Sequence, residues 1–277
     1  MEKRLDIELV NQGFVDSRTK AQELIKCGYV LCNGTVIRKN SFQVTDLDKI
    51  EVTENNSLKY VSRGGLKLEK AIEEFGINFH DKNIMDIGSS TGGFTDCAIQ
   101  HGANKVVAID VGTNVMDKEL RNNERVSLYE NTNVKDLDKS LFENIDYILI
   151  DVSFISLIKV FKKIEDTNIK VDVISLIKPQ FECGKEIADR YKGVILNPDI
   201  HKEIVRELIK EINSLNFYIK NLTFSPIRGG SGNIEYLAYF TNKINYNDKI
   251  DIDRIVTEAF ILLRTRISNR RVSKKAQ

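Results

Sequence analysis

The chain has 277 residues, of which 42% are hydrophobic and 29% are charged, and its formal net charge is only +1. This size allows one large domain with an appendage, and the near-neutral balance means that affinity for a polyanion must come from local basic clusters. No apolar stretch approaches the roughly 20 residues of a membrane span, and the start, "MEKRLDIELV", has no apolar signal core. We therefore expect a cytoplasmic protein with no stable membrane partner.

The cysteines and histidines do not form the spacing of a metal site. The four cysteines include no CxxC pair, and only three histidines are present. We expect no metal site, and free, mostly buried thiols in a reducing compartment at Cys27, Cys32, Cys97 and Cys183.

The first fifty residues predict two short amphipathic helices, a hairpin and a further strand. The first helix is closed by Gly13, and Asp16 or Ser17 can cap a second helix that stops at Gly28. In "YVLCNGTVI", Asn33-Gly34 separates two β-prone runs, which is the strongest short-range signal for a type I′ hairpin. The extended piece "DKIEVT" completes a small α+β domain, which we assign to residues 1–58.

This segment resembles the small RNA-binding fold named after the ribosomal small-subunit protein S-four. The resemblance is carried by "RLDIELVNQGFVDSRTKAQELIKCGYVLCNGTVI". It implies an RNA partner and basic contacts from Arg4, Arg18, Lys20 and Lys26. From spacing alone, a packing or dimerisation module with solvated lysines is an equal alternative, because runs of charge are usually solvated faces.

From residue 66 onward the pattern changes to α/β. A polar linker with two terminal glycines, residues 59–65, precedes short apolar runs that alternate with helical stretches up to residue 268. The last two runs, "FYIKNLTF" and "EYLAYF", predict an antiparallel hairpin at one edge of an otherwise parallel sheet. That reversed edge is typical of the Rossmann-like methyltransferase fold. Residues 269–277 form a basic tail for which we expect disorder.

A glycine-rich loop, "DIGSSTGGFTD", follows the first strand of this half. Glycines let a backbone approach a ligand closely at the carboxyl end of a strand. The spacing of Gly88, Gly92 and Gly93 departs from the dinucleotide fingerprint, which is tuned to a pyrophosphate. Asp110 ends the next strand, where a carboxylate can accept both ribose hydroxyls of an adenosine. The pair favours S-adenosyl-L-methionine, although a tight turn without a ligand would show the same glycines.

Four ionisable residues lie at strand or helix ends on the same expected rim. A ribose 2′-hydroxyl is a poor nucleophile and needs help to lose its proton, which a lysine beside another cation can give. We assign Lys178, which is held extended by the following proline, as the base or as the group that orients the hydroxyl. Asp151 and Glu235 would position Lys178 and Lys67. Each residue alone has a plain structural explanation, as a solvated lysine or a helix cap.

Together the motifs resemble the TlyA family of ribosomal-RNA 2′-O-methyltransferases, often labelled haemolysins, whose catalytic half is FtsJ-like. They are "VSRGGLKLEKA", "DIGSSTGGFTD", "ILIDVSFISL", "LIKPQFECGK" and "GGSGNIEYLAYF". The family's Lys-Asp-Lys-Glu tetrad falls here on Lys67, Asp151, Lys178 and Glu235. The resemblance implies methylation of cytidine ribose in ribosomal subunits or intact ribosomes, and cofactor contacts from Asp86, Gly88, Ser89, Gly92, Gly93, Phe94, Asp110 and Asn133.

The linker departs from the family, which usually has an Arg and a Trp where this chain has Lys59 and Tyr60. Coupling between the domains is therefore expected to differ.

Three other functions are possible alternatives for this sequence. A methyltransferase for base amino groups usually has prolines after an Asn or Asp at the fourth strand, whereas Asp151 precedes "VSF". A membrane-lytic protein would need a surface-seeking segment, and "IDRIVTEAFILLRTRIS" is more simply a terminal helix whose Ile255, Phe260, Leu262 and Leu263 cover the sheet. A scaffold that has lost catalysis is disfavoured because all four tetrad positions are filled.

Overall fold

The structure is a computed structural model that describes residues 2–15, 17–52, 59–244 and 249–272, without the side chains of residues 23, 26–27 and 264–272. The chain divides into two compact units, Met1–Gly65 and Leu66–Gln277, which we call the N-terminal and C-terminal units. The dividing point falls at the end of the predicted linker.

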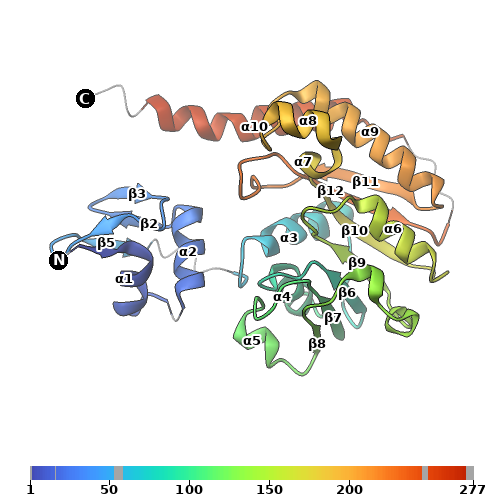
Figure 1. Ribbon diagram of the computed structural model, residues 1–277, viewed down its shortest axis with the longest axis horizontal. Helices are drawn as coiled ribbons and strands as arrows, with labels where there is room; N and C mark the ends of the chain where they lie inside the picture. Colours follow the sequence, from blue (N-terminus) through green and yellow to red (C-terminus); the bar gives the residue numbers. More distant parts are fainter. Residues whose placement is uncertain (1, 16, 53–58, 245–248, 273–277) are drawn as a thin grey trace. The chain divides into compact units, whose positions relative to one another are not determined.

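The N-terminal unit has the predicted order of two helices, a hairpin and a further strand (Figure 1). Ser17 caps the second helix by accepting the N–H of Lys20, and Gly28 ends it in the left-handed conformation. Asn33 and Gly34 both have positive φ, 50° and 74°, as a type I′ turn requires. The elements are α1 (Leu5–Asn11), α2 (Arg18–Cys27), β1 (Lys3–Arg4), β2 (Val30–Cys32), β3 (Thr35–Ile37), β4 (Gln43–Val44) and β5 (Ile50–Val52).

The C-terminal unit is built on a seven-stranded sheet. In spatial order its strands are β11 (Tyr218–Phe224), β12 (Tyr236–Thr241), β10 (Asp172–Ile177), β9 (Tyr147–Ile150), β6 (Asn83–Ile87), β7 (Lys105–Ile109) and β8 (Val126–Tyr129). The predicted hairpin at one edge is confirmed. Its inner strand, β12, is antiparallel to both neighbours, so the outermost strand β11 runs parallel to the rest.

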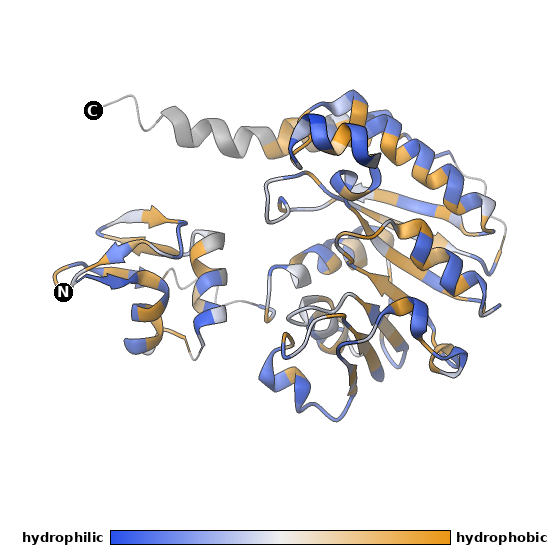
Figure 2. Ribbon diagram, viewed as in Figure 1, coloured by the Kyte–Doolittle hydropathy of each residue, from blue (hydrophilic) through white to orange (hydrophobic). Residues whose placement is uncertain are grey.

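Helices cover both faces of this sheet, as expected for an α/β fold. The strands between them consist largely of hydrophobic residues (Figure 2). The helices are α3 (Gly64–Phe75), α4 (Gly93–Gln100), α5 (Lys118–Arg121), α6 (Leu157–Glu165), α7 (Pro179–Glu182), α8 (Gly184–Tyr191), α9 (Pro198–Ser214) and α10 (Ile252–Val272), with short 3-10 turns η2 (Val134–Asp136) and η3 (Lys139–Phe142).

One face of the sheet forms a single large core with α6, α9 and α10. Side chains from alternate positions of the central strands enter this core, among them Met85 and Ile87 of β6 and Ile148 and Ile150 of β9. Because successive side chains of a strand point to opposite faces, the residues between them, such as Asp86, face the other side. Leu68 and Ala71 of α3 and Cys97 and Ala98 of α4 are also fully buried, outside that core.

The C-terminal helix packs on the protein. α10 contacts α9 and β11, and its Val256, Ala259 and Leu263 are buried in the large core, with Ile255 and Phe260 packed against it. Leu262 does not cover the sheet as expected, because it is 56% exposed. The helix ends at Val272, so it continues past residue 268 into the segment expected to be a disordered tail, whose last residues, 273–277, lie outside the described range.

Tyr60 of the linker is buried. It is only 2% exposed, and its ring lies so close to Gly65 that a Cβ there would be 2.2 Å from the ring. A larger residue than glycine therefore cannot occupy position 65 without displacing Tyr60.

Buried thiols are confirmed at Cys32 and Cys97, and Cys183 is a free, half-buried cysteine; the Cys27 side chain lies outside the described residues.

Candidate active site

The glycine loop lies where the strand order reverses. β6 pairs with β7 on one side and with β9 on the other, and ligands of open α/β sheets bind at such a switch point. The Gly88 N–H donates to Ile109 O of β7 at 2.8 Å. A Cβ on Gly88 would lie 2.7 Å from Asp151 O, and its φ is +85°. Only glycine therefore allows the loop to pass between the ends of the two neighbouring strands.

Asp110 organises the neighbouring rim. Its Oδ2 accepts the N–H of Ser90 at 2.8 Å, and its Oδ1 accepts the N–H of Gly112 at 2.7 Å. Asp110 O also accepts the N–H of Thr132, which brings Asn133 to the same rim, where its side chain caps η2 by accepting the Lys135 N–H. Each Asp110 oxygen keeps a second lone pair for a further donor.

Glu130, which the sequence analysis did not single out, holds the loop after Asp110. Its carboxylate accepts hydrogen bonds from the N–H groups of Asn114, Val115 and Met116, and it forms an ion pair with Arg121 at 2.7 Å. These donors, Arg121 first, lower the pKa of Glu130 to about 2. The loop is thus shaped by one carboxylate that stays ionised near neutral pH.

Two buried acceptors beside the loop are left without a partner among the described residues. They are Oδ1 of Asp86 and Oγ of Ser89, whose residues are 0% and 4% exposed. The other Asp86 oxygen accepts the Thr95 hydroxyl at 2.6 Å. Burial raises the pKa of Asp86 to about 7. Because buried polar atoms are nearly always hydrogen-bonded, these two fit a polar ligand with N–H or O–H groups.

The remaining predicted cofactor residues build the start of α4. Gly92 is its N-cap with φ +95°, Gly93 is its first residue, and Phe94 is buried at 3% exposure. A Cβ on Gly92 would lie 2.3 Å from the Leu120 side chain. The loop therefore turns tightly into the helix.

The four predicted tetrad residues converge because of strand alternation. Ile177 and Tyr236 form the last pair of the β10–β12 ladder. Lys178 directly follows Ile177, and Glu235 directly precedes Tyr236. Asp151 follows Ile150 in β9. All three occupy positions whose side chains leave the face of the α6–α9–α10 core. They therefore meet Lys67 of α3 on the opposite face.

The tetrad forms two ion pairs. Lys67 Nζ lies 2.7 Å from Glu235 Oε2, and Lys178 Nζ lies 2.6 Å from Asp151 Oδ1. Lys178 Nζ also donates to Ser153 Oγ at 3.0 Å. The Lys178–Asp151 contact is an ion pair rather than an aligned hydrogen bond, since Asp151 Oδ1 receives no donor in hydrogen-bond geometry from the described residues. Both lysines are nearly buried, at 9% and 8% exposure, so their ammonium groups are fixed by these partners.

An aromatic pair, of which Phe154 is exposed and Phe181 is half-buried, lies beside Lys178. Phe154 is 90% exposed, and its ring centroid lies 4.9 Å from that of Phe181. Phe154 has φ +65°, which is unfavourable for a bulky side chain. Lys178 Nζ lies 5.9 Å from the Phe181 ring. A strained, solvent-facing phenylalanine ring thus lies next to a phenylalanine that is close to the Lys178 amine.

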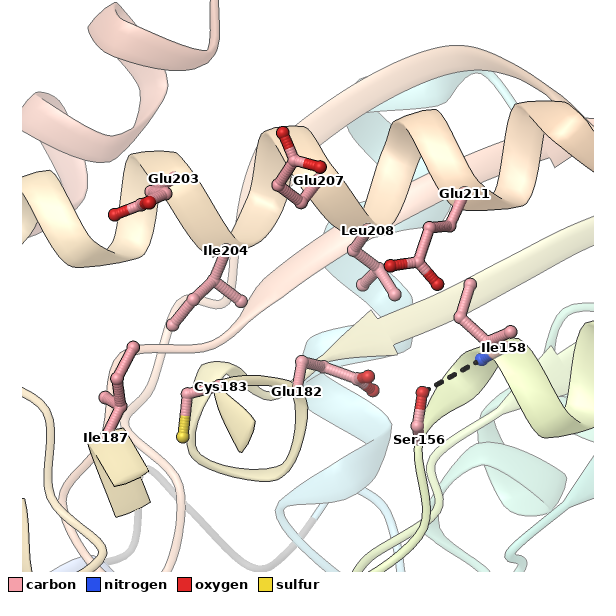
Figure 3. Close-up of a pocket in the computed structure, with 10 residues that line it drawn as sticks. All are labelled: Ser156, Ile158, Glu182, Cys183, Ile187, Glu203, Ile204, Glu207, Leu208 and Glu211. Carbon is pink, nitrogen blue, oxygen red and sulfur yellow. Dashed lines mark hydrogen bonds between the residues drawn. The ribbon is translucent and has the colours of Figure 1, made fainter. Parts of the chain in front are cut away.

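A separate pocket of about 220 Å³ is acidic (Figure 3). The glutamates Glu203, Glu207 and Glu211 recur at every fourth residue of α9, and Glu182 closes the far side. Burial raises the pKa of Glu182. Because negative side chains repel phosphodiesters, this pocket does not suit a nucleic acid.

In the N-terminal unit, two of the predicted RNA-binding residues are engaged by one carboxylate. Arg4 and Arg18 both form ion pairs with the buried Asp6, at 2.9 and 3.0 Å. Lys20 lies in the first turn of α2 and is half-buried. The Lys26 side chain lies outside the described residues.

The family models match both units. The S4 domain model matches residues 3–50, and the FtsJ-like methyltransferase model matches residues 60–242. A chain from Mycobacterium tuberculosis named 16S/23S rRNA (cytidine-2'-O)-methyltransferase TlyA is 35% identical over 238 residues, which cover 85% of this chain and 88% of that one. This chain belongs to the TlyA group of FtsJ-like methyltransferases. Hemolysin A of Brachyspira hyodysenteriae is 46% identical over 244 residues, 86% of this chain and 99% of that protein.

A solved structure supports the same fold for this TlyA-group chain. A Streptococcus thermophilus protein titled as a hemolysin has a TM-score of 0.76 and 34% identity, with 96% of this chain and 98% of that chain covered. The TlyA and hemolysin names therefore attach to relatives of one fold. Among the described residues, no helix is both long and apolar enough to cross a bilayer.

Sequence reasoning missed several residues at this site. Ser153 and Phe154 lie in the motif "ILIDVSFISL", in which only Asp151 is assigned a role from the sequence. Thr95 and Glu130 act through Asp86 and the loop after Asp110, and the sequence pattern does not indicate either of these hydrogen bonds. The one available signal was Phe154, an aromatic residue in a short polar segment after a buried strand.

Proposed function

We propose that this methyltransferase transfers the methyl group of S-adenosyl-L-methionine to a ribose 2′-hydroxyl of ribosomal RNA, on cytidine. The observation that carries the proposal is the pairing of Lys178 with Asp151 and of Lys67 with Glu235 beside the glycine loop. The TlyA relatives from Campylobacter jejuni and Mycobacterium tuberculosis are named rRNA (cytidine-2'-O)-methyltransferases, which supports the substrate class.

The cofactor fits the donors and acceptors of the loop. S-adenosyl-L-methionine supplies an electrophilic methyl group on a positively charged sulfur. Asp110 would accept the ribose hydroxyls, and Asp86 and Ser89 would accept from the polar end with the two atoms that lack partners. Gly88, Gly92, Gly93, Phe94 and Asn133 complete the pocket.

On the acceptor side, the chain holds a hydroxyl and removes its proton. Lys178 is assigned to the hydroxyl: as a neutral amine it would take the hydroxyl proton, and as an ammonium it would orient the hydroxyl, while Asp151 and Ser153 fix its nitrogen. Lys67, fixed by Glu235, supplies a positive charge that stabilises the developing alkoxide. The near burial of both lysines strengthens these charge interactions, since water screens them little.

Recognition of the RNA involves both units. The S4 domain would bind folded ribosomal RNA through Arg4, Arg18, Lys20 and Lys26, whereas a nucleotide at the tetrad must leave its stack. The exposed ring of Phe154, backed by Phe181, offers a face on which a splayed base can stack.

Mass mapping of ribose methylation on ribosomal RNA tests the proposal. Ribosomal subunits from a host that lacks the gene would be incubated with S-adenosyl-L-methionine and the protein, or with its Lys178→Ala variant. We expect a 2′-O-methylcytidine only with the unaltered protein. Methylation of a base, or no methylation of subunits, ribosomes or free RNA, would refute it.

A further inference from the structure

Asp6 lies at the centre of an ordered cluster in the N-terminal unit. It is the second residue of α1 and is fully buried. Arg4 donates to both of its oxygens, each at 2.9 Å, while Arg18 and Gln22 of α2 donate to Oδ2 at 3.0 and 2.9 Å. These donors, Arg4 first, hold the pKa of Asp6 well below its usual range. Asp6 is therefore a permanent anion that joins the starts of both helices.

The shared oxygen sets the spacing of the two guanidinium groups. Arg4 Nη2 and Arg18 Nε both lie within 3.0 Å of Asp6 Oδ2, so these nitrogens are at most about 6 Å apart and the two guanidinium groups are neighbours. Neighbouring guanidinium groups can direct the N–H groups that Asp6 does not use at one tetrahedral phosphate. Two cations at this distance repel each other unless an anion holds them. Asp6 supplies that anion and is itself out of reach of a ligand.

The two arginines still face outward. Their side chains are 38% and 54% exposed, whereas the Asp6 side chain is 0% exposed. Asp6 occupies Nε and Nη2 of Arg4 and only Nε of Arg18. The remaining N–H groups belong to planar forks whose orientation is fixed, and a fixed fork loses less entropy when it binds a phosphate.

We propose that Asp6 is a positioning residue that holds Arg4 and Arg18 as a clamp for a single backbone phosphate of RNA. The RNA class rests on the proposed function, but the clamp follows from the contacts of Asp6. A merely structural Asp6 would fasten α1 to α2 and leave RNA affinity unchanged.

The sign of one substitution separates the two roles. Asp6→Asn removes a negative charge, so general electrostatic attraction predicts equal or tighter RNA binding. Loss of positioning predicts the opposite. We expect Asp6→Asn in the full chain to bind in vitro transcribed 16S or 23S ribosomal RNA about tenfold more weakly, and the slope of log affinity against log salt to fall in magnitude by about one.

The matched control is Asp46→Asn. It removes the same negative charge from the same unit. Asp46 lies on the surface, where it pairs with Lys3 at 2.7 Å and has 67% of its side chain exposed. RNA affinity of this variant should stay the same or rise slightly. Thermal unfolding of both variants, compared with the unaltered chain, identifies the temperature at which all are folded during the binding assay.

A second test does not depend on the stability of Asp6→Asn. Replacing Arg4 and Arg18 together by Gln should lower the salt slope by about one, since both hold one phosphate, whereas two separate phosphates would lower it by about two. Binding by Asp6→Asn as tight as that of the unaltered chain, or a loss of two in the double variant, would overturn the clamp. In either case methylation by the unaltered chain would leave the proposed function standing. Failure of the unaltered chain to bind either RNA would overturn the clamp, whereas the proposed function is decided by methylation of the ribosomal subunits.

Discussion

Lys178 and Glu235 lie side by side, one residue beyond Ile177 and Tyr236, the last pair of the antiparallel β10–β12 ladder. Each has its counter-ion on another element. Lys178 pairs with Asp151, which follows β9, and Glu235 pairs with Lys67 of α3. Four charges from four parts of the chain are thus fixed by one register. A shift of β12 by a single residue would turn Glu235 to the opposite face.

Removal of the Lys178 amine should stop methyl transfer without affecting donor binding. We expect Lys178→Ala to lower the methylation rate by roughly 10²- to 10⁴-fold, the range for loss of a positioned acid–base group. Isothermal titration calorimetry with S-adenosyl-L-methionine should give a dissociation constant close to that of the unaltered chain. Lys82→Ala, at a surface lysine whose side chain is 42% exposed, is the control and should keep full activity. An active Lys178→Ala variant would remove this lysine from the mechanism.

Replacing Phe154 by glycine should lower methylation activity and raise the stability of the fold. Its φ of +65° is strained for phenylalanine but free for glycine, and its side chain is 90% exposed, so Phe154→Gly should raise the free energy of unfolding by up to about 1 kcal/mol. The same change removes the stacking face and should lower RNA methylation severalfold or more.

The control for Phe154 is Asn168→Gly, at another positive φ, 61°, in the turn after α6. It should stabilise the protein without any loss of methylation. If Phe154→Gly methylates ribosomal RNA at the unaltered rate, the ring does not contact the substrate.

Asp86 makes stability depend on pH in an unusual direction. Burial raises its pKa from 3.8 to about 7, so between these values the folded chain binds a proton that the unfolded chain has released. The contribution of Asp86 is complete below about pH 4 and is lost as the pH rises through 7. Asp86→Asn should abolish this part of the pH dependence, as measured by denaturant unfolding at pH 5.5 and pH 8. An equal loss of stability over this range in both proteins would contradict it.

Glu130 should influence donor affinity through the loop it anchors. Glu130→Gln removes the charge that three backbone N–H groups and Arg121 share. We expect the dissociation constant of S-adenosyl-L-methionine to rise about tenfold, the effect of one weakened charge-assisted hydrogen bond, with little change in rate at saturating donor. Glu143→Gln, at an exposed position after η3, should leave both values unaltered. A changed rate with an unchanged dissociation constant would count against this role.

Local sequence signals predicted much of the fold. Asn33-Gly34 gave the correct turn type, and Ser17 and Gly28 the correct helix ends, because these residues act through their own backbone angles or those of near neighbours. The reversed hairpin was also confirmed. Which of its strands lies inside was not predictable, since that depends on pairing between residues far apart in the chain.

The sites were predictable by residue type and less so by partner. Lys67, Asp151, Lys178 and Glu235 were named from strand ends, but the pairing of Lys67 with Glu235 follows from the place of β12 next to β10. Arg4 and Arg18 were expected to face RNA directly, and no local pattern indicated that Asp6 holds both. The strain at Phe154 has no sequence signal, because phenylalanine is rare at positive φ.

The insertion of β12 between β10 and β11 has a consequence for biosynthesis. Translation delivers the segment from Asp86 to Asn133 about a hundred residues before Glu235. β11 must then wait for the last strand, β12, to join it to the sheet. A nascent polypeptide can therefore assemble its donor pocket early, while Lys67 gains its counter-ion only near the end of synthesis. Prematurely terminated products that stop before the final hairpin should be catalytically silent.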